Sequence, residues 1–301
     1  MGSKEFLGVI PPILTLFGKN GDVDEDLQRR YVQFLIDSGL HGIFICGTFG
    51  SGIMMTIEQH KRTAQVCIDQ AKGRISCFVH VGSTSTDISV AMARNAEALG
   101  ADAVSSVPPF YYNHSKQAVV AHFETLVKSV KIPVFAYNNI ETTGFLITPD
   151  VAIELARIGV KGMKDTGPME NFYLMQTRVE NEGFDFQFII GKAAHWLPAA
   201  LVGVKGMVEG SANIFPEVVV DLYNTTVNQG IEAAVPLQKK VVRLRDIQLI
   251  GGKNMSTMAV LEMRGLKVGY PKAPFQTLDA TAKQRVRDAI VKEGLEGILK
   301  S

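Results

Sequence analysis

The chain has 301 residues, of which 46% are hydrophobic and 20% charged, and its formal net charge is +1. This is the composition of an ordinary globular protein, and the balanced charge argues against nucleic-acid binding, which would need a basic excess. No apolar run reaches the roughly 18 to 20 residues of a membrane-spanning helix, so we expect no membrane association.

Apolar, β-rich runs recur along the chain, and a helical pattern follows each of them. They begin about 20 to 33 residues apart, which is the length of one βα unit. Several runs, such as 42–46 and 132–136, are apolar without a break, as is typical of parallel strands covered on both sides. The predicted strands are 9–17, 42–47, 75–82, 102–108, 132–138, 159–164, 186–191 and 204–209.

Helix start signals lie between these runs. Asp24, Thr56 and Thr148 are typical N-cap residues, and Pro149 suits a first helical position. The predicted helices here are 25–38, 57–71, 88–99 and 150–157. Eight βα units in a row predict an α/β fold of the (β/α)8 TIM-barrel type. A doubly wound sheet is the alternative, but it would normally close with fewer strands.

From about residue 215 the strand signal ends and only helical patterns remain. We expect helices over 216–229, 231–249, 254–265 and 280–293. The first would be the eighth helix of the barrel. The predicted organisation is therefore a barrel over 1–229 and a helical C-terminal extension over 230–301. No low-complexity linker separates them, so the extension should pack on the barrel.

A lysine, Lys164, stands at the end of the sixth predicted strand, where TIM barrels carry their active sites. Val160, Gly162 and Lys164 share one face of this strand, so if Gly162 faces the barrel interior, Lys164 points into the mouth. A lysine in a dry pocket has a lowered pKa and becomes a neutral nucleophile. Taken alone, however, the segment fits an exposed lysine at a strand-to-loop junction better, because lysines are common at exposed loop edges.

Three other strand ends carry polar or aromatic groups. Strand two ends in the glycine-rich loop 47–52 with Thr48, strand four in Tyr111 and Tyr112, and strand five in Tyr137. The loop matches neither a Walker A motif nor a dinucleotide fingerprint. Its backbone N–H groups could cradle a carboxylate, although a loop without a ligand is the alternative. Each tyrosine by itself fits aromatic packing.

Metal and disulfide chemistry have no support in the sequence. The six histidines show no ligand spacing, so we expect no metal, and a zinc-dependent aldolase is disfavoured. Cys46, Cys67 and Cys77 have no paired spacing, and they are expected to be buried free thiols of a cytoplasmic protein.

Taken together, these motifs resemble the dihydrodipicolinate synthase / N-acetylneuraminate lyase family of pyruvate-dependent Schiff-base enzymes. The resemblance covers nearly the whole chain, and its strength lies in six segments occurring in order at strand ends. These segments are Gly47-Thr48 with Gly50, Pro109–Tyr112, Tyr137-Asn138 up to Gly144, Gly162–Asp165, Gly191, and Gly206 through 213–216.

The resemblance implies a role for each matching residue. Lys164 would form an imine with the keto carbon of pyruvate or a 2-keto acid, and Tyr137 would move protons to and from the substrate oxygen. Thr48 would belong to the hydroxyl relay, together with Tyr111 from a neighbouring subunit of a homotetramer. No cofactor is implied. The implied substrate-binding residues are Gly47, Thr48, Phe49, Gly50, Thr142, Gly191 and Glu209.

Departures from the family pattern bear on the substrate. Thr142 stands where the synthase branch has an arginine that binds the carboxylate of aspartate semialdehyde. Without this arginine, binding of aspartate semialdehyde should be weaker by about 2 to 5 kcal/mol. Phe49 replaces a second hydroxyl residue, and Ser51 replaces a glutamate. Lys192 and Glu209 bring charge to the tips of strands seven and eight, either as substrate contacts or as solvated loop charges.

The leading hypothesis is therefore a class I aldolase or lyase that releases pyruvate from a 2-keto-3-deoxy sugar acid. The same family offers dihydrodipicolinate synthase as the alternative, or a relative that decarboxylates or dehydrates a sugar acid. A pyridoxal-phosphate enzyme using Lys164 is another possibility. A keto-acid-binding protein without turnover remains a non-enzymatic alternative.

Overall fold

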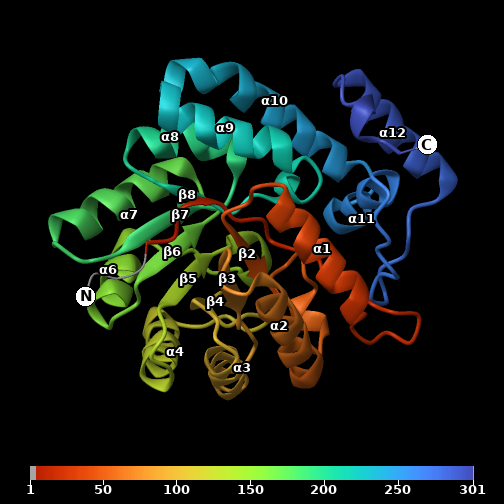
Figure 1. The fold of residues 1–301 in the computed structure, drawn as a ribbon. Helices are drawn as coiled ribbons and strands as arrows, with labels where there is room; N and C mark the ends of the chain where they lie inside the picture. The colour runs from red at the N-terminus through yellow and green to blue at the C-terminus, as the bar shows by residue number, and fades with distance from the viewer. Residues whose placement is uncertain (1–4, 301) are drawn as a thin grey trace.

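The computed structural model describes residues 5–300 as a parallel eight-stranded barrel surrounded by helices (Figure 1). Successive strands pair in parallel around the sheet in the order β1-β8-β7-β6-β5-β4-β3-β2, and a parallel bridge between Pro12 and Phe44 closes it. This confirms the predicted TIM barrel. The strands are β1 (Gly8–Val9), β2 (Gly42–Ile45), β3 (Ser76–His80), β4 (Ala103–Ser106), β5 (Val134–Asn138), β6 (Gly162–Asp165), β7 (Gln187–Ile190) and β8 (Gly206–Met207).

The first strand is shorter than the predicted run 9–17. Pro11 and Pro12 have no N–H group to donate to a strand ladder, so the regular pairing ends after two residues. The chain nevertheless stays beside β2, because the N–H of Ile13 donates to the carbonyl of Phe44 at 3.0 Å. The segment after β1, which has no regular strand pairing, thus closes the barrel against β2.

Helices follow the strands as predicted, and two of the expected caps form. Asp24 accepts from the N–H of Leu27 at 3.1 Å, and Thr56 forms a capping box with Gln59. Thr148 occupies an N-cap position without a side-chain hydrogen bond. The helices of the barrel are α1 (Glu25–Asp37), α2 (Ile57–Ala71), α3 (Thr86–Ala98), α4 (Lys116–Ser129), α5 (Ile140–Thr143), α6 (Pro149–Arg157), α7 (Met169–Asn181), α8 (Trp196–Leu201) and α9 (Pro216–Gln229). Short 3-10 helices are η1 (Gly52–Met54), η2 (Ala193–His195), η3 (Gly210–Asn213) and η4 (Glu296–Ile298).

The C-terminal region is helical, within two residues of the predicted bounds. It comprises α10 (Ile231–Leu249), α11 (Lys253–Met263) and α12 (Ala280–Lys292). The long helix α10 packs on α9 and α8 of the barrel, and α11 and α12 continue beyond it towards the C-terminus (Figure 1). A division of the chain at residues 229 and 230 stays a prediction. Across residues 5–300, no helix is both long and apolar enough to cross a membrane.

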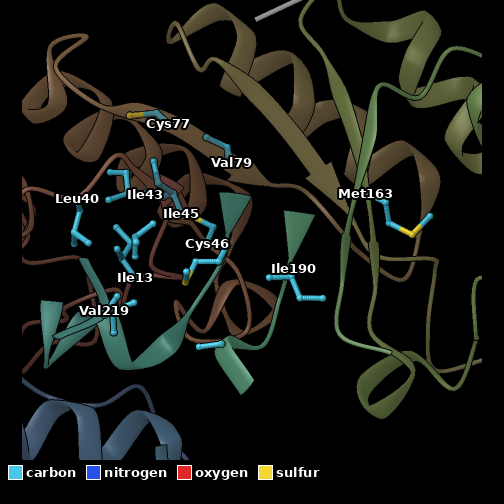
Figure 2. Packing of buried hydrophobic residues seen from close by; sticks show 14 of the residues in the cluster. Ile13, Leu40, Ile43, Ile45, Cys46, Cys77, Val79, Met163, Ile190 and Val219 are labelled. Atoms are coloured by element: carbon cyan, nitrogen blue, oxygen red, sulfur yellow. The ribbon is translucent and has the colours of Figure 1, made fainter. Parts of the chain in front are cut away.

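Two apolar layers position the strands. The larger lies between strands and helices and includes Ile43 and Ile45 of β2 and Met163 of β6 (Figure 2). The smaller fills the barrel interior with aromatic rings, among them Phe135. A Cβ on Gly162 would lie 2.3 Å from the Phe135 ring, so Gly162 faces the interior, as Lys164 does two residues later.

Candidate active site

Lys164 is buried at the carboxyl end of β6, with 5% of its surface exposed. Its partner across the sheet is Tyr137 of β5. The Nζ atom lies 3.9 Å from the centroid of the Tyr137 ring and 4.2 Å from that of Phe44. Within residues 5–300 it has no hydrogen-bond or ion-pair partner. Burial therefore lowers the pKa of Lys164 from 10.5 to about 7, against an opposing effect of the Glu209 charge. A large fraction of the amine is neutral at physiological pH.

The phenol of Tyr137 lies in a network of polar groups. Burial raises its pKa above the ordinary value, whereas hydrogen bonds with Thr48 and Thr166 oppose this rise. The side-chain amide of Asn139 also donates to the phenol oxygen at 3.2 Å. The Tyr137 hydroxyl is therefore protonated at rest and adjacent to other hydroxyl groups that can exchange protons with it.

The barrel interior below the amine also disfavours positive charge. The His80 ring, from β3, lies 6.0 Å from that of Tyr137, centroid to centroid. Burial, followed by the charge of Lys164, lowers the pKa of His80 to about 3. His80 is therefore neutral.

Glu209, which follows β8, is a buried carboxylate with 4% of its surface exposed. It accepts from the N–H of Ala193 at 2.6 Å and from both the N–H and the hydroxyl of Ser211 at 2.9 Å. These bonds tie the loops after β7 and β8 together. Glu209 is thus not a solvated loop charge. Lys192 lies nearer the rim, where its Nζ is 3.6 Å from a carboxylate oxygen of Glu141.

A cavity of about 120 Å³ opens above Lys164 at the carboxyl ends of the strands. Most of the predicted site residues meet there, and so do residues that sequence reasoning missed. The predicted residues on its wall are Thr48, Phe49, Tyr137, Thr142, Lys164, Gly191 and Glu209. Those not predicted as site residues include Asn139, Thr166, Arg245, Gln248, Lys253 and Asn254.

Two predicted glycines shape the loop after β2 without lining the cavity. A Cβ on Gly50 would lie 3.1 Å from backbone atoms of Cys46, and one on Gly47 would lie 2.9 Å from the ring of Phe44. A side chain at either position would force these neighbouring atoms to shift. Gly47 and Gly50 therefore let the loop turn tightly, and this turn presents Thr48 and Phe49 to the cavity.

Tyr111 lies away from the cavity of its own chain. It is 85% exposed, and its ring meets that of Tyr112 edge-on at 5.1 Å. Its φ of 79° is in the left-handed region, which is strained for a tyrosine. A strained backbone that holds an aromatic ring in solvent is unusual for a residue with only a packing role.

The C-terminal helices form one wall of the cavity. Arg245 and Gln248 of α10 reach it, as do Lys253 and Asn254 at the start of α11. The amide of Asn254 donates to the carbonyl of Phe49 at 2.9 Å, which fastens α11 to the loop after β2. No sequence signal identified these residues, because they lie far along the chain from the barrel strands.

A second cavity, of about 210 Å³, lies at the opposite end of the barrel among the amino ends of β5 to β8. Although it is larger, TIM barrels place their chemistry at the carboxyl ends of the strands, where Lys164 lies. We therefore assign the site to the smaller cavity. Among residues 5–300, no group of three or more His, Cys, Asp or Glu side chains is arranged to hold a metal ion.

Residues 5–293 match the family model described as the dihydrodipicolinate synthetase family. The chain belongs to this family. Members of the family are pyruvate-dependent lyases and aldolases, so the protein is an enzyme of the carbon-carbon lyase class. The predicted family resemblance is thereby confirmed.

Relatives within the family carry different names. A protein of Escherichia coli K12 named "Probable 2-dehydro-3-deoxy-D-pentonate aldolase YjhH" is 29% identical over 297 residues, covering 97% of this chain and 99% of that protein. A 4-hydroxy-tetrahydrodipicolinate synthase of Methanopyrus kandleri is 27% identical over 294 residues, covering 96% of each. The crystal structure of YagE of E. coli K12, a family member in complex with pyruvate, superposes with a TM-score of 0.91 at 23% identity, covering 97% of this chain and all of that one. The similarity to the YagE structure supports the assignment of the fold.

Proposed function

We propose that the protein is a class I aldolase that cleaves a 2-keto-3-deoxy sugar acid to pyruvate and an aldehyde, through an imine on Lys164. The observation that carries this proposal is a lysine amine buried against two aromatic rings, one of them a tyrosine, with no hydrogen-bond or ion-pair partner among residues 5–300. An amine in these surroundings is favoured in its neutral, nucleophilic form.

The proposed reaction begins when the neutral amine of Lys164 attacks the keto carbon, and loss of water leaves an iminium ion. The iminium withdraws electrons from the bond between C3 and C4, which breaks as the proton of the C4 hydroxyl is removed. The aldehyde leaves, and the remaining enamine takes up a proton at C3. Water then hydrolyses the iminium, which releases pyruvate and regenerates the amine.

Tyr137 is proposed as the group that moves the proton to and from the substrate oxygen. Its raised pKa keeps it protonated at rest, so it would first donate a hydrogen bond and then exchange protons through Thr48. The loop of Gly47, Thr48, Phe49 and Gly50 would hold the substrate carboxylate with its backbone N–H groups.

Tyr111 is proposed to complete the relay of a neighbouring subunit. Its exposure and its strained backbone support this role, since the side chain has no contact with its own cavity. We accordingly propose a homotetramer built as a dimer of dimers. A cytoplasmic location is proposed as well, in keeping with the free buried thiols of Cys46, Cys67 and Cys77.

The sugar-acid substrate is supported by Thr142, which lies in the cavity wall at the position where the synthase branch has an arginine. The E. coli relative whose name is "Probable 2-dehydro-3-deoxy-D-pentonate aldolase" points the same way. The alternative, 4-hydroxy-tetrahydrodipicolinate synthase, is supported by the names of several other relatives. Efficient turnover of pyruvate with aspartate semialdehyde would favour that alternative.

The decisive experiment is reduction of the enzyme with borohydride in the presence of pyruvate, followed by peptide mass spectrometry. The expected result is a covalent adduct on Lys164 and none on Lys161, an exposed lysine of the same segment. An unmodified Lys164 would end the proposal. Pyruvate mixed with a panel of aldehydes, read by product mass, then identifies the acceptor. Imine trapping without turnover of any aldehyde would instead indicate a keto-acid-binding protein.

A further inference from the structure

The rim of the catalytic cavity carries more positive than negative charge. Lys192, Arg245 and Lys253 line it together with Glu141 and Glu209. Glu209 is already satisfied by three donors, and Glu141 is the ion-pair partner of Lys192. No carboxylate of the cavity wall therefore neutralises the two cations of the C-terminal helices.

Arg245 is the group that most needs a partner. It is partly buried, and within residues 5–300 its guanidinium has neither an ion pair nor a hydrogen bond. Gln248, three residues further along α10, is 2% exposed and lines the same cavity, so this face of the helix is turned towards the site. A guanidinium offers two parallel N–H donors, which match the geometry of a carboxylate or a phosphate.

The start of α11 adds positive charge to the same wall of the cavity. Lys253 is its first residue, and the helix has neither a side-chain N-cap nor an acidic residue in its first turn. The wall is held in place, because Asn254 is hydrogen-bonded to the loop after β2. The basic groups are therefore parts of a packed wall and not of a free tail.

We propose that the end of the substrate remote from the keto group carries a second negative charge, held by Arg245 with Lys253. This inference rests on the proposed function. Its consequence is that the acceptor aldehyde bears a terminal carboxylate or phosphate. A neutral polyol would leave the guanidinium partly desolvated without a counter-charge. The cavity volume of about 120 Å³ corresponds to about ten water molecules, at about 10 to 15 Å³ each, and such a volume suits a short aldehyde.

Two matched acceptors test the terminal charge. Glyceraldehyde and tartronate semialdehyde (2-hydroxy-3-oxopropanoate) have the same reacting carbonyl and differ by a hydroxymethyl group against a carboxylate. Glyceraldehyde 3-phosphate adds the phosphate. With pyruvate fixed at saturation, one of the anions should show a kcat/KM at least tenfold above that of glyceraldehyde, and the better anion identifies the source of the charge.

Substitution of the arginine tests its role. Arg245→Gln should raise the KM for the preferred anion about tenfold or more, change the KM for glyceraldehyde less than twofold, and leave the KM for pyruvate unchanged. Lys253→Gln, at an exposed position, should act in the same sense but more weakly. Arg243→Gln is the matched control, because Arg243 lies on the same helix but pairs with Glu293 outside the cavity.

The failures of the two proposals are distinguishable. If borohydride traps pyruvate on Lys164 and the enzyme uses all three aldehydes equally, the anionic terminus is refuted and the aldolase stands. An increase in the KM for pyruvate alone on Arg245→Gln would overturn the inference by assigning Arg245 to the pyruvate carboxylate. Equal increases in the KM for the charged and the neutral aldehyde on Arg245→Gln would also overturn the inference. Absence of a trapped adduct refutes the proposed function itself.

Discussion

Replacing Lys164 by methionine should stabilise the folded protein at neutral pH, at the expense of all proposed activity. Methionine has a similar length and no charge, so it can fill the space between the rings of Tyr137 and Phe44 without the desolvation penalty of an ammonium. Removal of a functional side chain is expected to stabilise a protein when the function requires a buried group whose charged form is poorly solvated.

The magnitude follows from the lowered pKa. A fall from 10.5 to about 7 destabilises the folded state by about 5 kcal/mol at low pH, at about 1.4 kcal/mol for each pH unit. Between pH 7 and 10.5 the unfolded chain binds a proton that the folded chain does not, so the stability of the unmodified protein rises with pH. The penalty is about 4 kcal/mol at pH 7 and about 2 kcal/mol at pH 9, and it vanishes above pH 10.5.

The assay is urea or thermal unfolding of both proteins at pH 7 and pH 9, at one protein concentration. The unfolding free energy of Lys164→Met should exceed that of the unmodified protein at pH 7, and this difference should fall by about 2 kcal/mol at pH 9. For a chain of this size, the fall corresponds to about 3 °C in Tm. Lys161→Met is the control, because Lys161 is half exposed and pairs with Asp185. A difference between Lys164→Met and the unmodified protein that does not change with pH would refute the reasoning.

Three further predictions address the catalytic relay, the buried carboxylate and the close packing of β6. Tyr137→Phe should keep borohydride trapping of pyruvate but lower kcat about 10²-fold or more, since proton transfer is lost while the amine remains; normal turnover would exclude Tyr137 from the relay. Glu209→Gln should lower the pH midpoint of trapping at Lys164 below about 7 and reduce the stability by about 1 to 3 kcal/mol, because the Glu209 charge raises the Lys164 pKa and its oxygens accept three donors. An upward shift of the midpoint would contradict this electrostatic account. Gly162→Ala should lower the stability by about 1 to 3 kcal/mol, because the added Cβ meets a ring and a backbone oxygen, both at 2.3 Å. Gly297→Ala, where a Cβ meets nothing within 4 Å, is the control, and equal effects of the two changes would speak against the packing argument.

Much of the fold could be predicted because its signals are local. Unbroken apolar runs, N-cap residues and helix lengths are short-range properties, and they predicted the barrel and the four C-terminal helical segments. The strand over 9–17 was predicted too long, because an apolar run does not report the missing N–H groups of Pro11 and Pro12. The alternation of side chains along β6 also correctly oriented Lys164, given that Gly162 faces inward.

The chemical state of the site could not be predicted in the same way. The lowered pKa of Lys164 depends on Phe44 and Tyr137, which reach it from other strands. Glu209, for which a solvated loop position was one of two predictions, is buried, and the N–H of Ala193 reaches it from the loop after another strand, β7. Burial and hydrogen bonding are properties of the assembled barrel, and no window of sequence contains them.

By itself, the sequence determined the barrel, the lysine at the end of its sixth strand and the family, because periodicity and the order of motifs are written along the chain. Only the tertiary structure decided that the C-terminal helices form a wall of the cavity and bring Arg245 to it. The physical reason is that a side chain acquires its pKa, its partners and its access to substrate from neighbours in space. In this barrel, most of those neighbours lie tens to hundreds of residues away.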